Sequence, residues 1–152
     1  MIRIVAVGKI KESGLKALIA DYVQRIRRFL KLQVIEVADI PDNRPLVKVL
    51  NEEAKAILKE LKPKDFVILL AIDGIVLDSE RFAVLLNDWR NKPTDVVFVI
   101  GGSNGVSREV KGRADYCWSL SALTFPHQLS RLILVEQLYR GLMIADNRCY
   151  HK

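Results

Sequence analysis

Short apolar runs alternate along the chain with segments whose apolar residues recur at helical spacing. Several of the runs are continuous rather than alternating, as in Val96-Val-Phe-Val-Ile100. Continuous apolar runs are typical of strands that are covered on both faces, which is the usual situation in a parallel sheet. The predicted strands are Ile2–Val7, Leu32–Val37, Phe66–Ile72, Val96–Ile100 and Tyr116–Leu120.

Helical periodicity fills the segments between these strands. Apolar residues at i, i+3, i+4 and i+7 predict helices within residues 15–30, 46–61 and 82–89, and Ser107 as a cap predicts a short fourth helix through Arg113. We expect Ser79 and Ser107 to cap the third and fourth of these helices, because a serine oxygen accepts hydrogen bonds from free backbone amides.

The last predicted helix follows Pro126 and carries apolar residues on nearly every face. A helix of this kind must be covered on more than one side. Either other elements of the chain bury it or a second subunit does, and we predict a homodimer that packs through this helix. Within the helix, Glu136 and Arg140 have the i, i+4 spacing of a surface ion pair.

The alternation of strands and helices predicts an α/β fold with a mostly parallel sheet, in a single domain that spans residues 1–152. In open sheets of this class, ligands bind at the carboxyl ends of the strands. The loops after the third, fourth and fifth predicted strands therefore form the candidate site.

Basic residues are concentrated at one end of the chain. Lys and Arg number 24 against 18 Asp and Glu, which gives a net charge of +6. The first 31 residues contain eight basic and two acidic residues, so the other 121 contain 16 of each. A basic end favours a polyanionic partner such as nucleic acid, or it is a solvated helix face, and charge alone leaves both readings open.

The longest apolar run, Phe66–Ile72, has seven residues, whereas a membrane span needs about 20. We therefore expect no membrane segment, no signal peptide and a cytoplasmic location. The two cysteines, Cys117 and Cys149, lack the spacing of a zinc site and are too few for a disulfide framework. We expect two free thiols and no bound metal.

Glycines crowd the loop after the fourth predicted strand, Gly101-Gly-Ser-Asn-Gly105. Glycine lets the backbone turn tightly and approach a ligand closely. The spacing matches neither GxGxxG nor GxxxxGK[ST], so the ordinary phosphate-binding loops are disfavoured. A plain strand-to-helix turn is the alternative.

The loop after the fifth predicted strand, Leu120-Ser-Ala-Leu-Thr-Phe125, is unusually apolar for a connection. Backbone amides beside leucine and phenylalanine suit a flat heterocycle such as adenine, whereas a buried crossing of the chain explains the same apolarity. His127 and Arg131 follow, as a structural hydrogen-bonding group and as a partner for phosphate or carboxylate. The terminal Tyr150-His151-Lys152 is either a frayed end or a functional element.

The combination of these segments resembles a known family. The segments are Val5-Ala-Val-Gly-Lys9, Val99-Ile-Gly-Gly-Ser-Asn-Gly105, Leu120-Ser-Ala-Leu-Thr-Phe-Pro-His127, Val135-Glu-Gln-Leu-Tyr-Arg140 and Tyr150-His151-Lys152. Each is weak alone, but all of them in order over the whole chain resemble the ribosomal large subunit methyltransferase H family, the smallest members of the SPOUT (α/β-knot) class.

This resemblance implies a Rossmann-like sheet whose C-terminal part threads a trefoil knot, and a homodimer in which the knotted regions pack together. It implies S-adenosyl-L-methionine as cofactor and N3-methylated pseudouridine in 23S ribosomal RNA of assembled ribosomes as product. The family's cofactor-binding positions correspond here to Leu70, Gly101, Leu120, Ser121, Ala122, Leu123, Thr124 and Phe125.

The resemblance also implies that the tail of one subunit completes the site of its neighbour. His151 is the candidate for the group nearest the acceptor base, as a general base or a positioning group, with Tyr150 beside it. Phosphate contacts to the ribosome are expected from the basic end of the chain (Lys9, Lys11, Arg25, Arg27 and Arg28), with His127 and Arg131 as weaker candidates.

Two other functions compete with this interpretation. One is a SPOUT-class methyltransferase that acts on transfer RNA, which the short chain disfavours. The other is a non-catalytic ribosome-binding factor of the same fold, which the intact loops around Gly101 and Leu120 disfavour.

Overall fold

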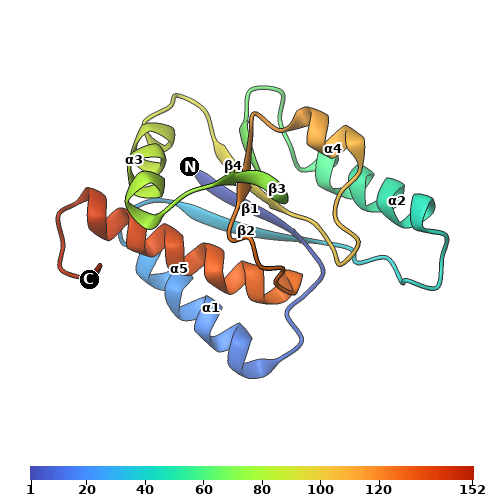
Figure 1. Cartoon of the computed structure of the whole chain (residues 1–152), viewed down its shortest axis with the longest axis horizontal. Coiled ribbons are helices and arrows are strands. Elements are labelled where there is room, and N and C mark those ends of the chain that lie inside the picture. Colours follow the sequence, from blue (N-terminus) through green and yellow to red (C-terminus); the bar gives the residue numbers. More distant parts are fainter.

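Parallel strands form one sheet in the computed structural model of the chain, which describes residues 1–152 (Figure 1). Every strand pair is parallel, and the strand order is β2-β1-β4-β3-β5. The predicted α/β fold with a mostly parallel sheet is therefore confirmed. The strands are β1 (Ile2–Val7), β2 (Leu32–Val37), β3 (Phe66–Val76), β4 (Val96–Ile100) and β5 (Tyr116–Ser119).

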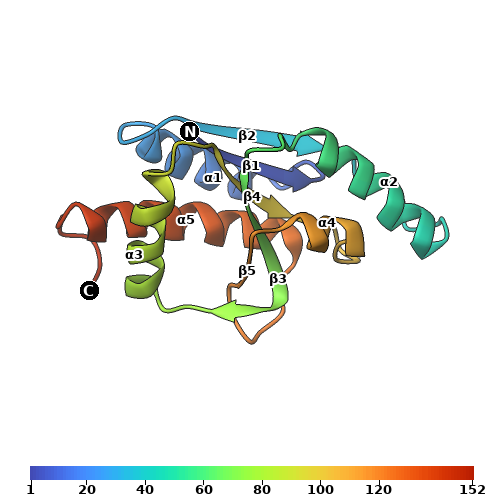
Figure 2. The same cartoon turned by 90° about the horizontal axis from the view of Figure 1, so that it is seen from above.

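Helices cover both faces of the sheet, and Figures 1 and 2 show the resulting three layers. The helices α1, α3 and α5 pack on one face, and α2 and α4 pack on the other. Their bounds are α1 (Ser13–Ile26), α2 (Leu46–Lys59), α3 (Ser79–Arg90), α4 (Arg108–Arg113) and α5 (His127–Ala145).

The alternation of side chains along β1 explains why its apolar run is continuous. Ile2, Ile4 and Ala6 belong to the cluster under α1, α3 and α5. Val5 and Val7 point to the opposite face and pack with Ala54 and Ile57 of α2 and Val110 of α4. Both faces of this strand are buried, so its residues are apolar except for Arg3 near the amino end.

Some predicted boundaries were wrong by a few residues. Helix α1 ends at Ile26, although its apolar pattern continues to Leu30, because the chain turns there and Phe29 still packs on the core. The N-cap of α3 is Asp78, whose carboxylate accepts from the Arg81 amide at 2.7 Å. Ser79 instead donates to Gln137 of α5 at 2.7 Å. Ser107 caps α4 as predicted.

Helix α5 is covered by elements of its own chain. It lies between α1 and α3 and against the sheet, which buries Leu134, Val135, Leu138 and Leu142. The chain itself therefore covers much of this helix, and the predicted dimer that packs through it stays a prediction. Neither this helix nor any other is both long and apolar enough to cross a membrane.

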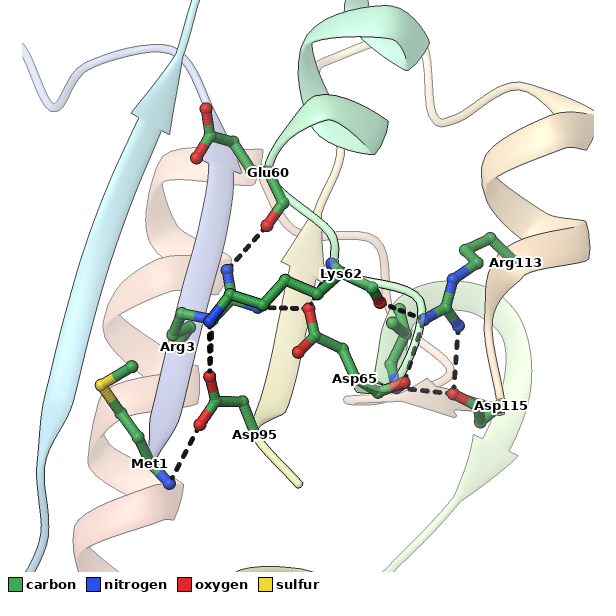
Figure 3. A network of polar contacts seen from close by, with 9 residues as sticks. Met1, Arg3, Glu60, Lys62, Asp65, Asp95, Arg113 and Asp115 are labelled. Atoms are coloured by element: carbon green, nitrogen blue, oxygen red, sulfur yellow. Dashed lines mark hydrogen bonds and ion pairs between the residues drawn. The ribbon is translucent and has the colours of Figure 1, made fainter. Parts of the chain in front are cut away.

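A polar network fastens the amino edge of the sheet, opposite the loops that follow the strands (Figure 3). Arg3 is 4% exposed and forms an ion pair with the buried carboxylate of Asp65. Its guanidinium also donates to the Glu60 carbonyl at 2.7 Å. The α-amino group of Met1 lies 3.4 Å from Asp95, so the chain terminus is part of the network.

Candidate active site

A cavity of about 930 Å³ opens at the carboxyl edge of the sheet. It lies between residues 70–73 of β3 and the segments that follow β4 and β5, and these strands are neighbours in the sheet. The first turn of α5 closes one side with His127 and Ser130. The predicted loops after the fourth and fifth strands therefore line one cavity, as expected for ligand sites in parallel α/β sheets, whereas the chain after Ile72 continues as part of β3.

The glycine loop packs so tightly that its first residue has no room for a side chain. A Cβ on Gly101 would lie 2.5 Å from Val106 Cγ1 and 2.8 Å from the Gly105 carbonyl oxygen. Gly105 has a φ of +80°, which closes the turn back toward Gly102. The loop thus presents bare backbone to the cavity.

Serine hydroxyls shape the loop after β5. The Ser119 hydroxyl donates to the Ser121 carbonyl at 2.9 Å, and the Ser121 hydroxyl accepts from the Leu123 amide at 3.0 Å. These bonds fold the segment into a tight bend, with Leu123 70% exposed at the cavity. Because these polar atoms bond within the segment, it presents mainly apolar side chains and a few free backbone groups to the cavity.

The structure brings together nearly all of the residues predicted to bind the cofactor. The lining includes Leu70, Gly101, Leu120, Ser121, Leu123, Thr124 and Phe125. Ala122 is exposed and does not line the cavity. The ligand contacts of these residues stay a prediction, but their positions meet the geometric requirement.

An ion pair at the rim was missed in the sequence. Lys111 of α4 lies 3.0 Å from Asp73, which belongs to the extension of β3, and both line the cavity. The hydrogen bond from Lys111 holds the pKa of Asp73 below its usual value. The only sequence signal was a carboxylate within an otherwise apolar strand end, and its partner is 38 residues away.

Two polar side chains at the start of α5 have different environments. His127 lines the cavity, and its Nε2 atom is buried and has no hydrogen-bond partner. Arg131 is 2% exposed, lies 2.5 Å from Glu36 and donates to the Gly8 carbonyl at 2.7 Å. Of the two predicted roles for Arg131, the carboxylate partner is the observed one.

A buried carboxylate lies behind the glycine loop. Glu53 of α2 is 4% exposed, and a Cβ on Gly102 would lie 3.0 Å from its Oε2 atom. Burial raises the pKa of Glu53, although the Ile40 amide donates to it at 3.5 Å. The glycine loop therefore rests against a group whose charge depends on pH.

The C-terminal tail folds back along α5 and is anchored there. The Tyr150 hydroxyl lies 3.3 Å from the Tyr22 hydroxyl and donates to Glu136 at 3.2 Å. The rings of Tyr150 and Tyr139 meet edge to face at 4.9 Å, and the Arg140 guanidinium lies 4.9 Å from the Tyr150 ring centre. Burial and these hydrogen bonds raise the pKa of Tyr150.

His151 lies beside α5 rather than at the cavity of its own chain. Its Nδ1 atom is 3.2 Å from Arg140, and its Nε2 atom is 3.8 Å from Glu80. Arg140 is thirteen residues beyond His127 (140 − 127), which corresponds to about 20 Å along a helix. Figure 1 shows the C-terminus at the end of α5 remote from its first turn. The cavity and the tail are thus separate within one chain.

The lining residues fit a bent nucleoside better than a metal or a bare phosphate. The cavity combines apolar side chains, free backbone groups and one unpartnered histidine nitrogen. No group of His, Cys, Asp or Glu in the structure has a geometry that holds a metal ion. Cys117 is half-buried, Cys149 is exposed, and both are free thiols.

Comparisons with known proteins agree with this geometry. A family model described as a predicted SPOUT methyltransferase matches residues 1–151. A protein of Caldicellulosiruptor bescii named ribosomal RNA large subunit methyltransferase H is 44% identical over all of both chains. A protein of Streptococcus gordonii with the same name is 45% identical over 99% of each chain.

Solved structures of lower identity share the fold. A probable methyltransferase from Bordetella pertussis Tohama I aligns with a TM-score of 0.54 at 14% identity and covers 93% of each chain. A probable methylase family protein from Haemophilus influenzae aligns with a TM-score of 0.55 at 16% identity over 99% of this chain and 70% of that one.

Proposed function

The chain belongs to the SPOUT methyltransferase family, and from this premise we propose that it methylates N3 of a pseudouridine in 23S ribosomal RNA on assembled ribosomes in the cytoplasm. The observation that carries the proposal is the cavity at the ends of β3, β4 and β5. Seven of the eight residues to which the family resemblance assigns cofactor contacts line this cavity. They converge from three segments that are remote in sequence.

S-adenosyl-L-methionine is the proposed cofactor, and when bound it supplies an electrophilic methyl group. The apolar side chains of Leu120, Leu123 and Phe125 are proposed to enclose the adenine faces. The absence of a side chain at Gly101 lets the glycine loop fold tightly against Val106 and Gly105, and Gly101 itself lines the cavity. Holding the reactants in line lowers the activation free energy by about 7–11 kcal/mol in favourable cases.

The acceptor nitrogen must lose a proton, and the cavity of one chain offers few groups for this task. His127 faces the cavity, whereas His151 lies beside Arg140 on α5. We propose that His151 of the neighbouring subunit lies nearest the acceptor base. The anchored Tyr150 then has a positioning role, because its hydroxyl is already bonded to Tyr22 and Glu136.

This arrangement requires a homodimer in which the tail of each subunit reaches the cavity of the other. Large apolar side chains remain exposed at the cavity (Ile72 and Leu123) and elsewhere on β3 and on the first turn of α5 (Ile75, Val76 and Leu129). Clustered exposed apolar groups are typical of subunit interfaces. We propose that they pack against the second subunit. We also propose that the C-terminal part of the chain forms a trefoil knot, as the family resemblance implies.

Methyl transfer from labelled cofactor tests the proposal directly. The purified protein is incubated with radiolabelled S-adenosyl-L-methionine and unmethylated assembled ribosomes, with separated subunits and bulk transfer RNA in parallel. We expect label in the large-subunit RNA of assembled ribosomes. Label confined to transfer RNA would overturn the substrate, and cofactor binding without transfer to any RNA would identify a non-catalytic factor.

A further inference from the structure

The exposed face of α2 carries a row of cations that the chain itself does not neutralise. Lys48, Lys55 and Lys59 are spaced by seven and four residues, which places them on one side of the helix. All three are exposed, and none forms an ion pair or a side-chain hydrogen bond. We call these three lysines the α2 stripe.

A shallow groove of about 450 Å³ lies at the start of α2, where the α2 stripe also begins. Its lining has no apolar side chain and includes three cations and one carboxylate. The carboxylate, Glu52, lies 3.2 Å from Arg44, so the ammonium groups of Lys48 and Lys55 have no carboxylate partner in the groove. The stripe extends over eleven residues (59 − 48), or about 16 Å of helix.

The loop that precedes the α2 stripe adjoins the cavity. The loop that leads into α2 is bonded to the glycine loop, because the Asn104 amide donates to Asp42 at 2.9 Å and Asn104 lines the cavity. Glu53, on the buried side of α2, rests against Gly102. Figures 1 and 2 show α2 beside α4 at the outside of its layer. A polyanion along α2 would thus lead to the cavity mouth.

Two arginines of the basic end have partners within the chain, whereas its exposed lysines, Lys9, Lys11, Lys16 and Lys31, form no ion pair. Arg25 lies 2.7 Å from Asp21, and it also lies over the ring of Tyr22. Arg27 donates to the Leu32 carbonyl at 3.1 Å. Of the three arginines in this segment, only Arg28 has no partner within the chain.

From these contacts we propose that the α2 stripe binds the phosphate backbone of the RNA substrate and guides the strand toward the cavity. The inference rests on the proposed function, since it names the surface through which that substrate is held. Lysine ammonium groups act as point charges for phosphate. Three such groups along one face match a strand better than a single anion.

The test neutralises the stripe with the triple variant Lys48→Gln, Lys55→Gln, Lys59→Gln. A matched control neutralises three exposed lysines that precede strands at the opposite edge of the sheet, namely Lys31, Lys64 and Lys92. Both variants change net charge equally. Binding to ribosomes and to protein-free large-subunit RNA is measured as a function of salt, together with methyl transfer and cofactor affinity.

We expect the stripe variant to bind both RNA targets at least about tenfold more weakly at low salt, and the slope of log affinity against log salt to fall by about 2–3. KM for ribosomes rises, while cofactor affinity stays at the wild-type value. The control variant retains most of the wild-type affinity and slope.

Equal behaviour of the two triple variants would overturn the inference. An affinity loss with ribosomes but not with protein-free RNA would also overturn it, because the stripe would then contact an acidic protein. If the wild-type protein binds RNA through the stripe but transfers no methyl group, the proposed function fails and the inference stands. If methyl transfer occurs and neutralising the stripe has no effect, the proposed function stands and the inference fails.

Discussion

Gly101 is a residue whose replacement tests whether the close packing of the glycine loop is needed for cofactor binding. A methyl group there would lie 2.5 Å from Val106 and would push the glycine loop from its position. We expect Gly101→Ala to lower cofactor affinity at least about tenfold in calorimetry and the free energy of unfolding by about 1–3 kcal/mol. The control is Gly112→Ala, because that position in α4 has open space around it.

The control has an expected outcome of its own. Alanine favours a helix over glycine by roughly 0.5–1 kcal/mol, so Gly112→Ala should leave the fold intact or stabilise it. A similar loss of cofactor affinity in both variants would show that the affinity does not depend on the close packing around Gly101.

Tyr150 contributes through its hydroxyl. Tyr150→Phe removes the bonds to Tyr22 and Glu136 but keeps the ring contacts with Tyr139 and Arg140. We expect slower methyl transfer at unchanged cofactor affinity, and a loss of about 0.5–1.5 kcal/mol in the free energy of unfolding.

Tyr116→Phe is the matched control for this substitution, because the Tyr116 hydroxyl forms no hydrogen bond in the structure. Its methyl transfer and stability should stay close to wild type. Wild-type transfer by Tyr150→Phe would exclude a positioning role for the hydroxyl.

Glu53 gives the protein a pH dependence of definite sign. Burial raises its pKa above the usual 4.5, so the folded state binds the proton more tightly than the unfolded chain does. This contribution to the free energy of unfolding is present below pH 4.5 and is lost as the pH rises through the raised value. Glu53→Gln removes the dependence and keeps an acceptor for the Ile40 amide.

Urea unfolding at two pH values checks this expectation. The glutamine variant should be more stable than wild type at pH 7 and similar to it below the usual pKa of 4.5. A variant that is less stable than wild type at pH 7 would mean that the carboxylate gains more from its surroundings than burial costs.

At the scale of elements, the pattern of apolar residues determined most of what sequence reasoning could predict. Continuous runs such as Val96–Ile100 predicted parallel strands, and parallel strands bring their following loops to one edge. The cavity follows from that argument without any pair contact being known. The register of β3 after Leu70 does not follow, because its extension depends on pairing with Trp118 of β5.

Features made by partners distant in sequence escaped prediction for the same reason. The pair of Asp73 and Lys111 joins β3 to α4, and the cap of α3 shifted to Asp78 because Ser79 bonds to α5. The balanced charge of residues 32–152 concealed the lysines of α2, since only the structure shows which cations lack partners. A count of charges cannot separate paired from unpaired groups.

At the scale of the whole molecule, the proposed role of the tail requires two subunits, because the cavity and the tail are separate within one chain. Sedimentation at micromolar concentration should therefore show a dimer. Cofactor should bind a chain that lacks Tyr150–Lys152 as it binds the wild type, because the cavity lining includes no tail residue. The same truncated chain should not transfer methyl groups, and a monomeric or fully active truncated protein would contradict the shared site.

Mixed dimers decide whether the tail acts within its own chain or across the interface. Gly101→Ala damages the cavity and leaves the tail intact, whereas truncation does the opposite. In a heterodimer of the two, one site combines an intact cavity with the partner's intact tail. Equal mixing followed by subunit exchange should restore about one quarter of wild-type activity, since half of the dimers are mixed and each has one complete site. If the tail served its own cavity, every site in the mixture would lack one component and no activity would return.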